Sequence, residues 1–222
     1  MTAEPVAIAV GDGKVSGLLL KPAKPRALYV LAHGAGAGMA HPFMEAVAQG
    51  LAQRGIATLR YQFPYMERGS KRPDTPKVAQ GAVRAAVAEA ARRMPGIPLY
   101  AGGKSFGGRM TSQAQSAAAL ENVRGLAFLG FPLHAAGKPS DERGAHLADV
   151  KVPMLFLSGS RDDLASLDLL RPLVKKLGTR ARLVVLEGAD HSFHVPAKSG
   201  RKDPEVLAEA LDAFAAWVES NR

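Results

Sequence analysis

Hydrophobic and polar positions follow two different periods along this chain. Two short apolar runs, Val6–Val10 and Val15–Leu20, flank Gly11-Asp12-Gly13, and this arrangement predicts a β-hairpin. Further along, short continuous apolar runs, which are typical of buried strands, alternate with longer segments whose apolar residues recur at helical spacing. Strands that alternate with helices predict a mostly parallel sheet with helices packed on both faces.

The pattern predicts six further strands and five helices. The strands are Ala27–Ala32, Ile56–Tyr61, Ile97–Ala101, Val123–Leu129, Met154–Leu157 and Arg182–Leu186. The helices are Pro42–Gln53, Pro76–Arg93, Phe106–Leu120, Leu164–Leu177 and Pro204–Ser220. Capping residues support two of these boundaries, since Thr75 precedes a proline at the first helical position and Gly178 follows Leu177. With the hairpin, the sequence predicts eight strands.

One serine has the surroundings of a catalytic nucleophile. Ser105 lies in Gly103-Lys104-Ser105-Phe106-Gly107, after a predicted strand and before a predicted helix. This is the pattern of a nucleophile elbow, a sharp turn that lifts a serine hydroxyl above the sheet. The glycines remove Cβ atoms that would clash, and the N-terminus of the next helix favours an oxyanion. The alternative interpretation is a structural turn serine.

An acid and a histidine follow later strands in the chain order that a serine hydrolase of this kind needs. Ser158–Asp163 follows one predicted strand and Glu187–Phe193 follows the last one. Open α/β sheets bind ligands at the carboxyl ends of their strands, so these groups can meet Ser105 there. His191 is the expected base, because a serine hydroxyl is inert until a base takes its proton. Asp162 and Asp163 are both candidates for the acid that orients the base.

These segments resemble the α/β-hydrolase superfamily. More narrowly, they resemble the small lidless group that includes testis-expressed protein 30-like and KAT8 regulatory NSL complex subunit-like hydrolase domains. The resemblance spans nearly the whole chain and rests on His33–Gly38, Arg60–Tyr65, Gly103–Gly107, Gly130–His134, Gly137–Pro139, Ser158–Asp162 and Asp190–Phe193. It implies an α/β-hydrolase fold in one domain over residues 1–222, with a mostly parallel eight-stranded sheet and no cap domain.

The resemblance also assigns site residues. It favours Asp162 over Asp163 as the acid, and it identifies Asp190–Phe193 as the segment of the catalytic histidine. His194 is then interpreted as a surface or supporting residue. Two histidines three residues apart do not by themselves make a metal site, because no helix or third ligand accompanies them. No metal and no cofactor are therefore expected.

An oxyanion hole needs two backbone N–H donors. Phe106, the residue after the nucleophile, is expected to supply one of them. By resemblance Ala35 supplies the other, in the glycine-rich loop His33–Gly38, which His33 is expected to brace. A glycine-rich loop could instead cradle a phosphate, but this one lacks both the Lys-Ser/Thr ending of a P-loop and the dinucleotide spacing.

Substrate-binding residues are expected where other strands end at the same edge. Phe63 and Tyr65 could form an apolar wall after one strand. Phe131 and His134 follow another, where a proline-stiffened surface loop is an equal alternative. Lys104 and Arg109, which flank the elbow, are interpreted as exposed charges near the start of a helix.

The segment that would hold a lid in many members of this fold is short here. Gly130–Val152 is polar and too short for an independent helical cap. The site is therefore expected to be a shallow cleft that favours short acyl groups. Four loops should form it: His33–His41, Tyr61–Tyr65, Phe131–Pro139 and His191–Val195.

Composition fits one globular domain. Hydrophobic residues make up 47% of the 222, enough for a sizeable core. The chain has no cysteine, which excludes disulfides and thiol chemistry and fits a cytoplasmic protein. The segment Met1–Val10 lacks the pattern of a secretory signal, and no apolar stretch approaches the length of a membrane span. The sequence leaves open whether the protein is a monomer or a homodimer.

The formal net charge of +9 raises the question of a nucleic-acid partner. The basic residues are mostly dispersed, and the one dense patch, Arg68, Lys71, Arg72 and Lys77, has no interleaved aromatic residues for stacking on bases. We therefore expect no specific nucleic-acid partner and no membrane partner. The expected substrate is a small-molecule ester, cleaved by a serine carboxylesterase through an acyl-enzyme. The alternative is a catalytically weak or inactive partner-binding module, since the family it resembles includes members of chromatin complexes.

Overall fold

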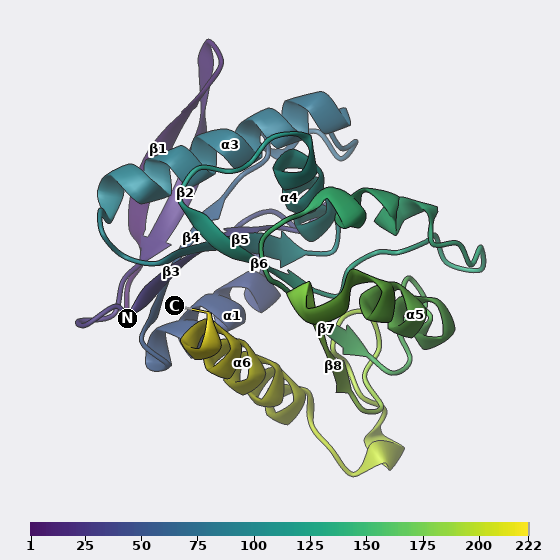
Figure 1. Ribbon diagram of the computed structural model, residues 1–222. Coiled ribbons are helices and arrows are strands. Elements are labelled where there is room, and N and C mark those ends of the chain that lie inside the picture. Colours follow the sequence, from purple (N-terminus) through teal and green to yellow (C-terminus); the bar gives the residue numbers. More distant parts are fainter. Residues whose placement is uncertain (222) are drawn as a thin grey trace.

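The computed structural model describes residues 1–221. Within this part of the chain, eight strands form one sheet in the order β1-β2-β4-β3-β5-β6-β7-β8 (Figure 1). The strands are β1 Glu4–Val10, β2 Gly13–Leu20, β3 Ala27–Ala32, β4 Ile56–Tyr61, β5 Leu99–Lys104, β6 Val123–Leu129, β7 Met154–Gly159 and β8 Ala181–Leu186. Strand β2 is antiparallel to β1 and β4, and β3 to β8 are parallel to one another. The predicted hairpin and mostly parallel sheet are confirmed.

Helices cover both faces of the sheet (Figure 1). The helices α1 (Pro42–Gln53) and α6 (Asp203–Ser220) lie on one face, and α3 (Pro76–Arg93) and α4 (Phe106–Ala117) lie on the other. Helix α5 (Leu167–Leu177) packs beside β8 at the edge of the sheet. The shorter helical segments are α2 Pro64–Glu67, η1 Glu142–Asp149, η2 Gly178–Arg180 and η3 Ala197–Ser199.

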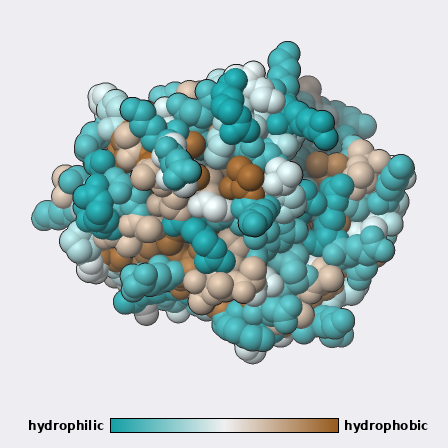
Figure 2. All heavy atoms as spheres, turned by 90° about the horizontal axis from the view of Figure 1, so that it is seen from above, coloured by the Kyte–Doolittle hydropathy of each residue, from teal (hydrophilic) through white to brown (hydrophobic). Residues whose placement is uncertain are grey.

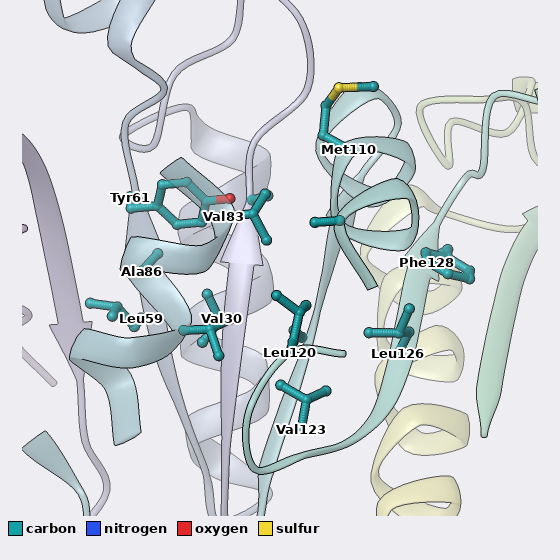
Figure 3. Packing of buried hydrophobic residues seen from close by; sticks show 14 of the residues in the cluster. Val30, Leu59, Tyr61, Val83, Ala86, Met110, Leu120, Val123, Leu126 and Phe128 are labelled. Atoms are coloured by element: carbon teal, nitrogen blue, oxygen red, sulfur yellow. The ribbon is translucent and has the colours of Figure 1, made fainter. Parts of the chain in front are cut away.

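Two apolar layers hold the helices to the sheet. In one layer, Val83 of α3 and Met110 of α4 share a cluster of buried side chains with Val30 of β3 (Figure 3). In the other, Phe214 of α6 packs edge-on against Tyr29, with ring centroids 4.8 Å apart. Because alternate strand residues point to opposite faces, β3 supplies both layers and is buried along its whole length.

Several predicted boundaries were wrong, and local hydrogen bonds explain two of them. Helix α5 begins at Leu167 rather than Leu164, because the backbone N–H of Leu164 donates to Asp162 Oδ1 and its carbonyl accepts from His134. Helix α4 ends at Ala117, and the side chain of Gln115 accepts from the N–H of Leu120 beyond that end. Strand β5 runs over Leu99–Lys104, so it extends closer to Ser105 than expected.

The predicted absence of a cap domain is confirmed for the part of the chain that the structure describes. The segment between β6 and β7 contains the short 3₁₀ helix η1, whose Leu147 is buried in the core. None of the described helices is long and apolar enough to cross a membrane. Figure 2 shows one face of the molecule, which is mostly hydrophilic and carries its apolar residues in small separate groups.

Candidate active site

The turn that carries Ser105 has the strained backbone of a nucleophile elbow. Ser105 has φ 48° and ψ −116°, a positive φ that non-glycine residues adopt at an energetic cost. The chain is tightly packed on either side. A Cβ on Gly103 would lie 2.2 Å from the carbonyl oxygen of Ala32, and one on Gly107 would lie 2.6 Å from the same atom. Both positions therefore require glycine, and the turn places Ser105 at the N-terminus of α4.

The structure brings Ser105, His191 and Asp162 together at the carboxyl edge of the sheet. His191 Nε2 lies 2.8 Å from Ser105 Oγ, and His191 Nδ1 lies 2.8 Å from Asp162 Oδ2. The side chain of Asp162 is fully buried, and its Oδ1 also accepts a hydrogen bond from the N–H of Leu164 at 2.8 Å. With Nδ1–H donated to the carboxylate, Nε2 is the nitrogen free to accept the serine proton.

The competing acid and histidine lie elsewhere. Asp163 is exposed, and it lines a separate surface pocket. His194 is exposed as well, and its Nδ1 lies 2.9 Å from Asp203 Oδ2 at the start of α6. The hydrogen bond that His194 donates to the Asp203 carboxylate raises the pKa of His194. Geometry therefore separates both residues from Ser105.

The glycine-rich loop after β3 is held from below by residues that follow β4. His33 Nδ1 donates to the carbonyl oxygen of Gly34 at 2.7 Å, and its Nε2 accepts from the N–H of Phe63 at 3.0 Å. The Tyr65 hydroxyl accepts from the N–H of Gly36 at 3.0 Å. Burial lowers the pKa of His33 to about 4, so the ring is neutral and can make both bonds at once. His33 thus braces this loop, as the sequence suggested.

Two backbone N–H groups close to Ser105 are the candidates for an oxyanion hole. Phe106 is the first residue of α4, so its N–H has no partner within the helix. Ala35 is exposed in the glycine-rich loop, and within residues 1–221 nothing accepts a hydrogen bond from its N–H. That loop lies close to the elbow, since a Cβ on Gly34 would be 3.8 Å from the Cβ of Ser105.

A pocket of about 490 Å³ opens beside Ser105. Its walls come from the glycine-rich loop, the start of α1, the elbow and the segment that carries His191. The lining residues are Gly34, Ala35, Ala37, His41, Phe43, Met44, Lys104, Ser105, Leu164, His191 and Ser192. Three apolar members of this lining, Phe43, Met44 and Leu164, were not expected from the sequence. The signal available was that Phe43 and Met44 lie at the start of the first helix after the glycine-rich loop.

The aromatic residues expected in the cleft lie elsewhere. Phe63, Tyr65 and Phe131 are buried, and none of them lines the pocket beside Ser105. Phe63 and Tyr65 turn inward to pack under the glycine-rich loop, at 4.9 Å and 6.0 Å between ring centroids from His33. Phe131 packs against Phe128 in the core. The apolar wall expected from Phe63 and Tyr65, and the lining expected from Phe131, are therefore not found at the pocket beside Ser105.

His134 has a supporting position. It is buried, and its Nε2 accepts a hydrogen bond from the N–H of Ser166 at 3.0 Å while its Nδ1 donates to the carbonyl of Ala135. It lines a second, more polar pocket of about 820 Å³ beside Asp162 and Asp163, which does not include Ser105. His134 therefore joins two loops and does not contact the pocket at the elbow.

The two charges that flank the elbow are not exposed. Lys104 is the last residue of β5 and lines the pocket beside Ser105. Its Nζ donates to the backbone carbonyl oxygen of His191, and burial lowers the pKa of Lys104 to about 8. Arg109 is half-buried one turn into α4, and burial lowers its pKa as well. Sequence reasoning missed Lys104 because its side chain turns back toward a segment 87 residues away.

Comparison with known proteins shows the family to which the chain belongs. Residues 25–219 match the family described as "Alpha/beta hydrolase domain". Among solved structures, the chain resembles a dienelactone hydrolase from Anabaena variabilis, with TM-score 0.81 and 22% identity over 99% of this chain and 98% of that one. It also resembles a lidless α/β serine hydrolase from Xanthomonas campestris, with TM-score 0.74 and 19% identity over 96% and 95% of the two chains.

A curated relative is named as a transferase and not as a hydrolase. The chain is 29% identical over 198 residues to a putative phosphoribosyl transferase from Mycobacterium tuberculosis, covering 87% of this chain and 42% of the relative. The chain thus spans less than half the length of that relative. The narrower resemblance to the testis-expressed protein 30-like and KAT8 regulatory NSL complex subunit-like group stays a prediction.

Proposed function

The chain belongs to the α/β-hydrolase family, and we propose that within it the protein is a serine hydrolase that cleaves small carboxylic esters through an acyl-enzyme. One observation carries the proposal. His191 Nε2 lies 2.8 Å from Ser105 Oγ, and His191 Nδ1 lies 2.8 Å from Asp162 Oδ2. A nucleophile, a base and an orienting acid are thus linked by hydrogen bonds.

The first half of the proposed reaction forms the acyl-enzyme. Ser105 Oγ attacks the ester carbonyl carbon while its proton passes to His191 Nε2. The charge on the carbonyl oxygen is stabilised by the N–H groups of Phe106 and Ala35, aided by the positive end of the α4 dipole. Asp162 stabilises the imidazolium through its hydrogen bond to Nδ1. His191 then gives its proton to the leaving alkoxide, which departs as an alcohol.

The second half reverses these roles with water. His191 takes a proton from a water molecule, and the resulting hydroxide attacks the acyl carbon. The tetrahedral intermediate collapses, Ser105 Oγ recovers its proton from His191, and a carboxylic acid is released. The mostly apolar lining of the 490 Å³ pocket suits an uncharged acyl or alcohol group of modest size.

Covalent labelling tests the proposal directly. A fluorophosphonate should attach to Ser105 in the wild-type protein, and peptide mass spectrometry should locate it there. Ser105→Ala should abolish the labelling and the hydrolysis of p-nitrophenyl esters, while Ser112→Ala, in the same helix and away from the pocket, should keep both. A wild-type protein that neither labels nor hydrolyses any ester would contradict the proposal and favour the partner-binding alternative.

Three other features of the proposal come from the sequence alone. The cytoplasmic location suggested by the lack of cysteines stays a prediction, as does the absence of a specific nucleic-acid partner. The expectation of a monomer or homodimer also stays open to direct measurement of molecular mass in solution.

A further inference from the structure

We infer that Lys104 is a positioning residue of this site: its ammonium anchors the segment that carries His191 and supplies a counter-charge to buried Asp162. The inference rests on the proposed function, because it assigns Lys104 a task within that reaction. It comes from three independent features of the structure, namely the contacts of Nζ, the space at Gly130 and the charge balance around Asp162.

The contacts of Lys104 tie two distant parts of the chain together. Its Nζ donates a hydrogen bond to the backbone carbonyl oxygen of His191. The same ammonium lies over the rings of Phe193 and Phe43, at 5.4 Å and 5.7 Å from their centroids. Lys104, the residue next to Ser105 in sequence, is therefore hydrogen-bonded to the backbone of His191.

The segment that is held has a strained backbone. Phe193 has φ 65°, which a bulky side chain rarely adopts, and the surrounding structure must impose it. Phe193 is buried, and its ring packs at 5.7 Å from Phe43 as well as under the ammonium. Lys104 thus contacts both the carbonyl of His191 and the ring of Phe193, the residue with the strained backbone.

Space for the ammonium exists because residue 130 is glycine. A Cβ on Gly130 would lie 2.8 Å from Lys104 Nζ and 3.2 Å from both Nδ1 and Cε1 of His191. The N–H of Gly130 donates to Leu157 at 2.8 Å, so its position just after β6 is fixed. A side chain there would push the ammonium and the imidazole apart. Gly130 therefore leaves the space in which Lys104 reaches the backbone of His191.

The charge balance points the same way. The carboxylate of Asp162 is fully buried, and among the described residues His191 is the only ionisable side chain bonded to it. A buried carboxylate needs compensation, since desolvation of a charge is costly. Lys104 interacts electrostatically with Asp162 and with Asp190, and both raise its pKa against the larger lowering by burial, which leaves it at about 8.

The groups that face this ammonium define its expected pH response. They are Asp162 after β7 and Asp190 and His191 after β8, while His41 lines the same pocket from the start of α1. Loss of the Lys104 proton near pH 8 would remove the counter-charge and weaken the grip on His191. Wild-type turnover should then decline above about pH 8, the value at which Lys104 titrates.

The experiment compares Lys104→Met, which keeps the length of the stem, with Lys71→Met, a matched change at an exposed lysine in a surface loop. Lys104→Met should lower kcat for p-nitrophenyl butyrate and the rate of fluorophosphonate labelling by about tenfold or more, because small displacements of a catalytic group are costly. KM should change less than kcat, because the ammonium bonds the His191 carbonyl and its proposed role is to position the base. The decline above pH 8 should disappear in Lys104→Met and persist in Lys71→Met.

A second variant and a measurement of folding distinguish a lost interaction from a misfolded protein. Gly130→Ala should reproduce the loss of kcat, and thermal denaturation by circular dichroism should show that both variants are folded. If wild-type protein does not label, the proposed function fails, and the proton resonances of the His191 ring then decide about Lys104. They should shift in Lys104→Met and stay unchanged in Lys71→Met. Wild-type turnover with an unchanged alkaline decline in Lys104→Met, or an unmoved His191 ring, would overturn the inference.

Discussion

The hydroxyl of Tyr65 lies 3.0 Å from the backbone nitrogen of Gly36 and accepts its hydrogen bond. Tyr65 was expected to line the substrate cleft, but it is buried beneath the loop that carries Ala35. Through this contact the short helix α2 supports the proposed oxyanion hole without touching a substrate. The conformation of an exposed glycine-rich loop is thereby coupled to a buried aromatic cluster.

Replacing this tyrosine should therefore affect turnover more than binding. Tyr65→Phe leaves the N–H of Gly36 without its partner, which should cost about 1 kcal/mol of stability. It should also lower kcat for p-nitrophenyl esters several-fold with little change in KM, because the Ala35 N–H is held less firmly. Tyr29→Phe is the matched control: it removes a buried hydrogen bond to Ala127, 2.8 Å long, on β6. Equal kcat in the two variants would contradict the supporting role of Tyr65.

The two adjacent aspartates should behave very differently. Asp162→Asn places an amide against His191 Nδ1 and favours the wrong tautomer, so kcat should fall by about 10³-fold or more. Asp163→Asn changes an exposed side chain and should leave kcat within about twofold, as surface substitutions usually do. Steady-state ester hydrolysis by both variants, with circular dichroism as the folding control, measures this. The opposite ranking would reassign the acid to Asp163.

Acidification should destabilise the protein through two histidines, His33 and His146, whose pKa values burial lowers. Burial lowers the pKa of His33 to about 4, and burial beside Arg109 lowers that of His146 to about 4. The unfolded chain, with ordinary histidines near 6.5, binds these protons first as the pH falls. Stability should therefore decrease between about pH 6.5 and 4, by roughly 1 kcal/mol per histidine at pH 5.5.

Urea unfolding at pH 7 and 5.5 measures this loss, and the ring resonances of each histidine identify its source. His33 and His146 should stay neutral down to about pH 4, whereas exposed His194, whose pKa Asp203 raises, should titrate above its ordinary value. A His33 ring that titrates near 6.5 would show that it is not a neutral brace of the glycine-rich loop.

The pocket beside Ser105 should favour short acyl groups. Its volume of about 490 Å³ opens to solvent with no cap domain among the described residues, so a long chain would remain largely hydrated. Each buried methylene contributes only about 0.8 kcal/mol, and few of them can be buried here. Acetyl and butyryl esters should be hydrolysed at least as efficiently as octanoyl and palmitoyl esters. A steep rise in kcat/KM toward palmitoyl would instead reveal a deep acyl channel.

Any affinity for nucleic acid should be weak and dependent on salt. The net charge is +9, but Arg68 of the dense basic patch already pairs with Asp74 at 2.7 Å. Non-specific binding driven by dispersed charge falls steeply as salt increases. Fluorescence anisotropy with labelled DNA and RNA at 50 and 200 mM salt would measure this fall. Tight, sequence-selective binding at the higher salt would contradict the prediction.

Local sequence was enough to determine the elements and the order of the proposed chemical groups. Short apolar runs predicted every strand, and the inner strands such as β3, β4 and β7 have continuous runs because they are buried on both faces. The glycines around Ser105 predicted the elbow, because no other residue fits within 2.6 Å of a carbonyl oxygen. The acid and histidine could be proposed because parallel strands bring their carboxyl ends to one edge.

Tertiary structure alone decided which way side chains turn after a strand ends. Phe63 and Phe131 are aromatic residues of the kind that line pockets, yet both are buried. An apolar ring is stabilised more by burial in the core than by a place in an open cleft. Lys104 shows the reverse case, a charge drawn inward by the His191 carbonyl and by two aromatic rings. The outcomes for Phe63 and Lys104 depend on partners 30 and 87 residues away, which a local pattern does not contain.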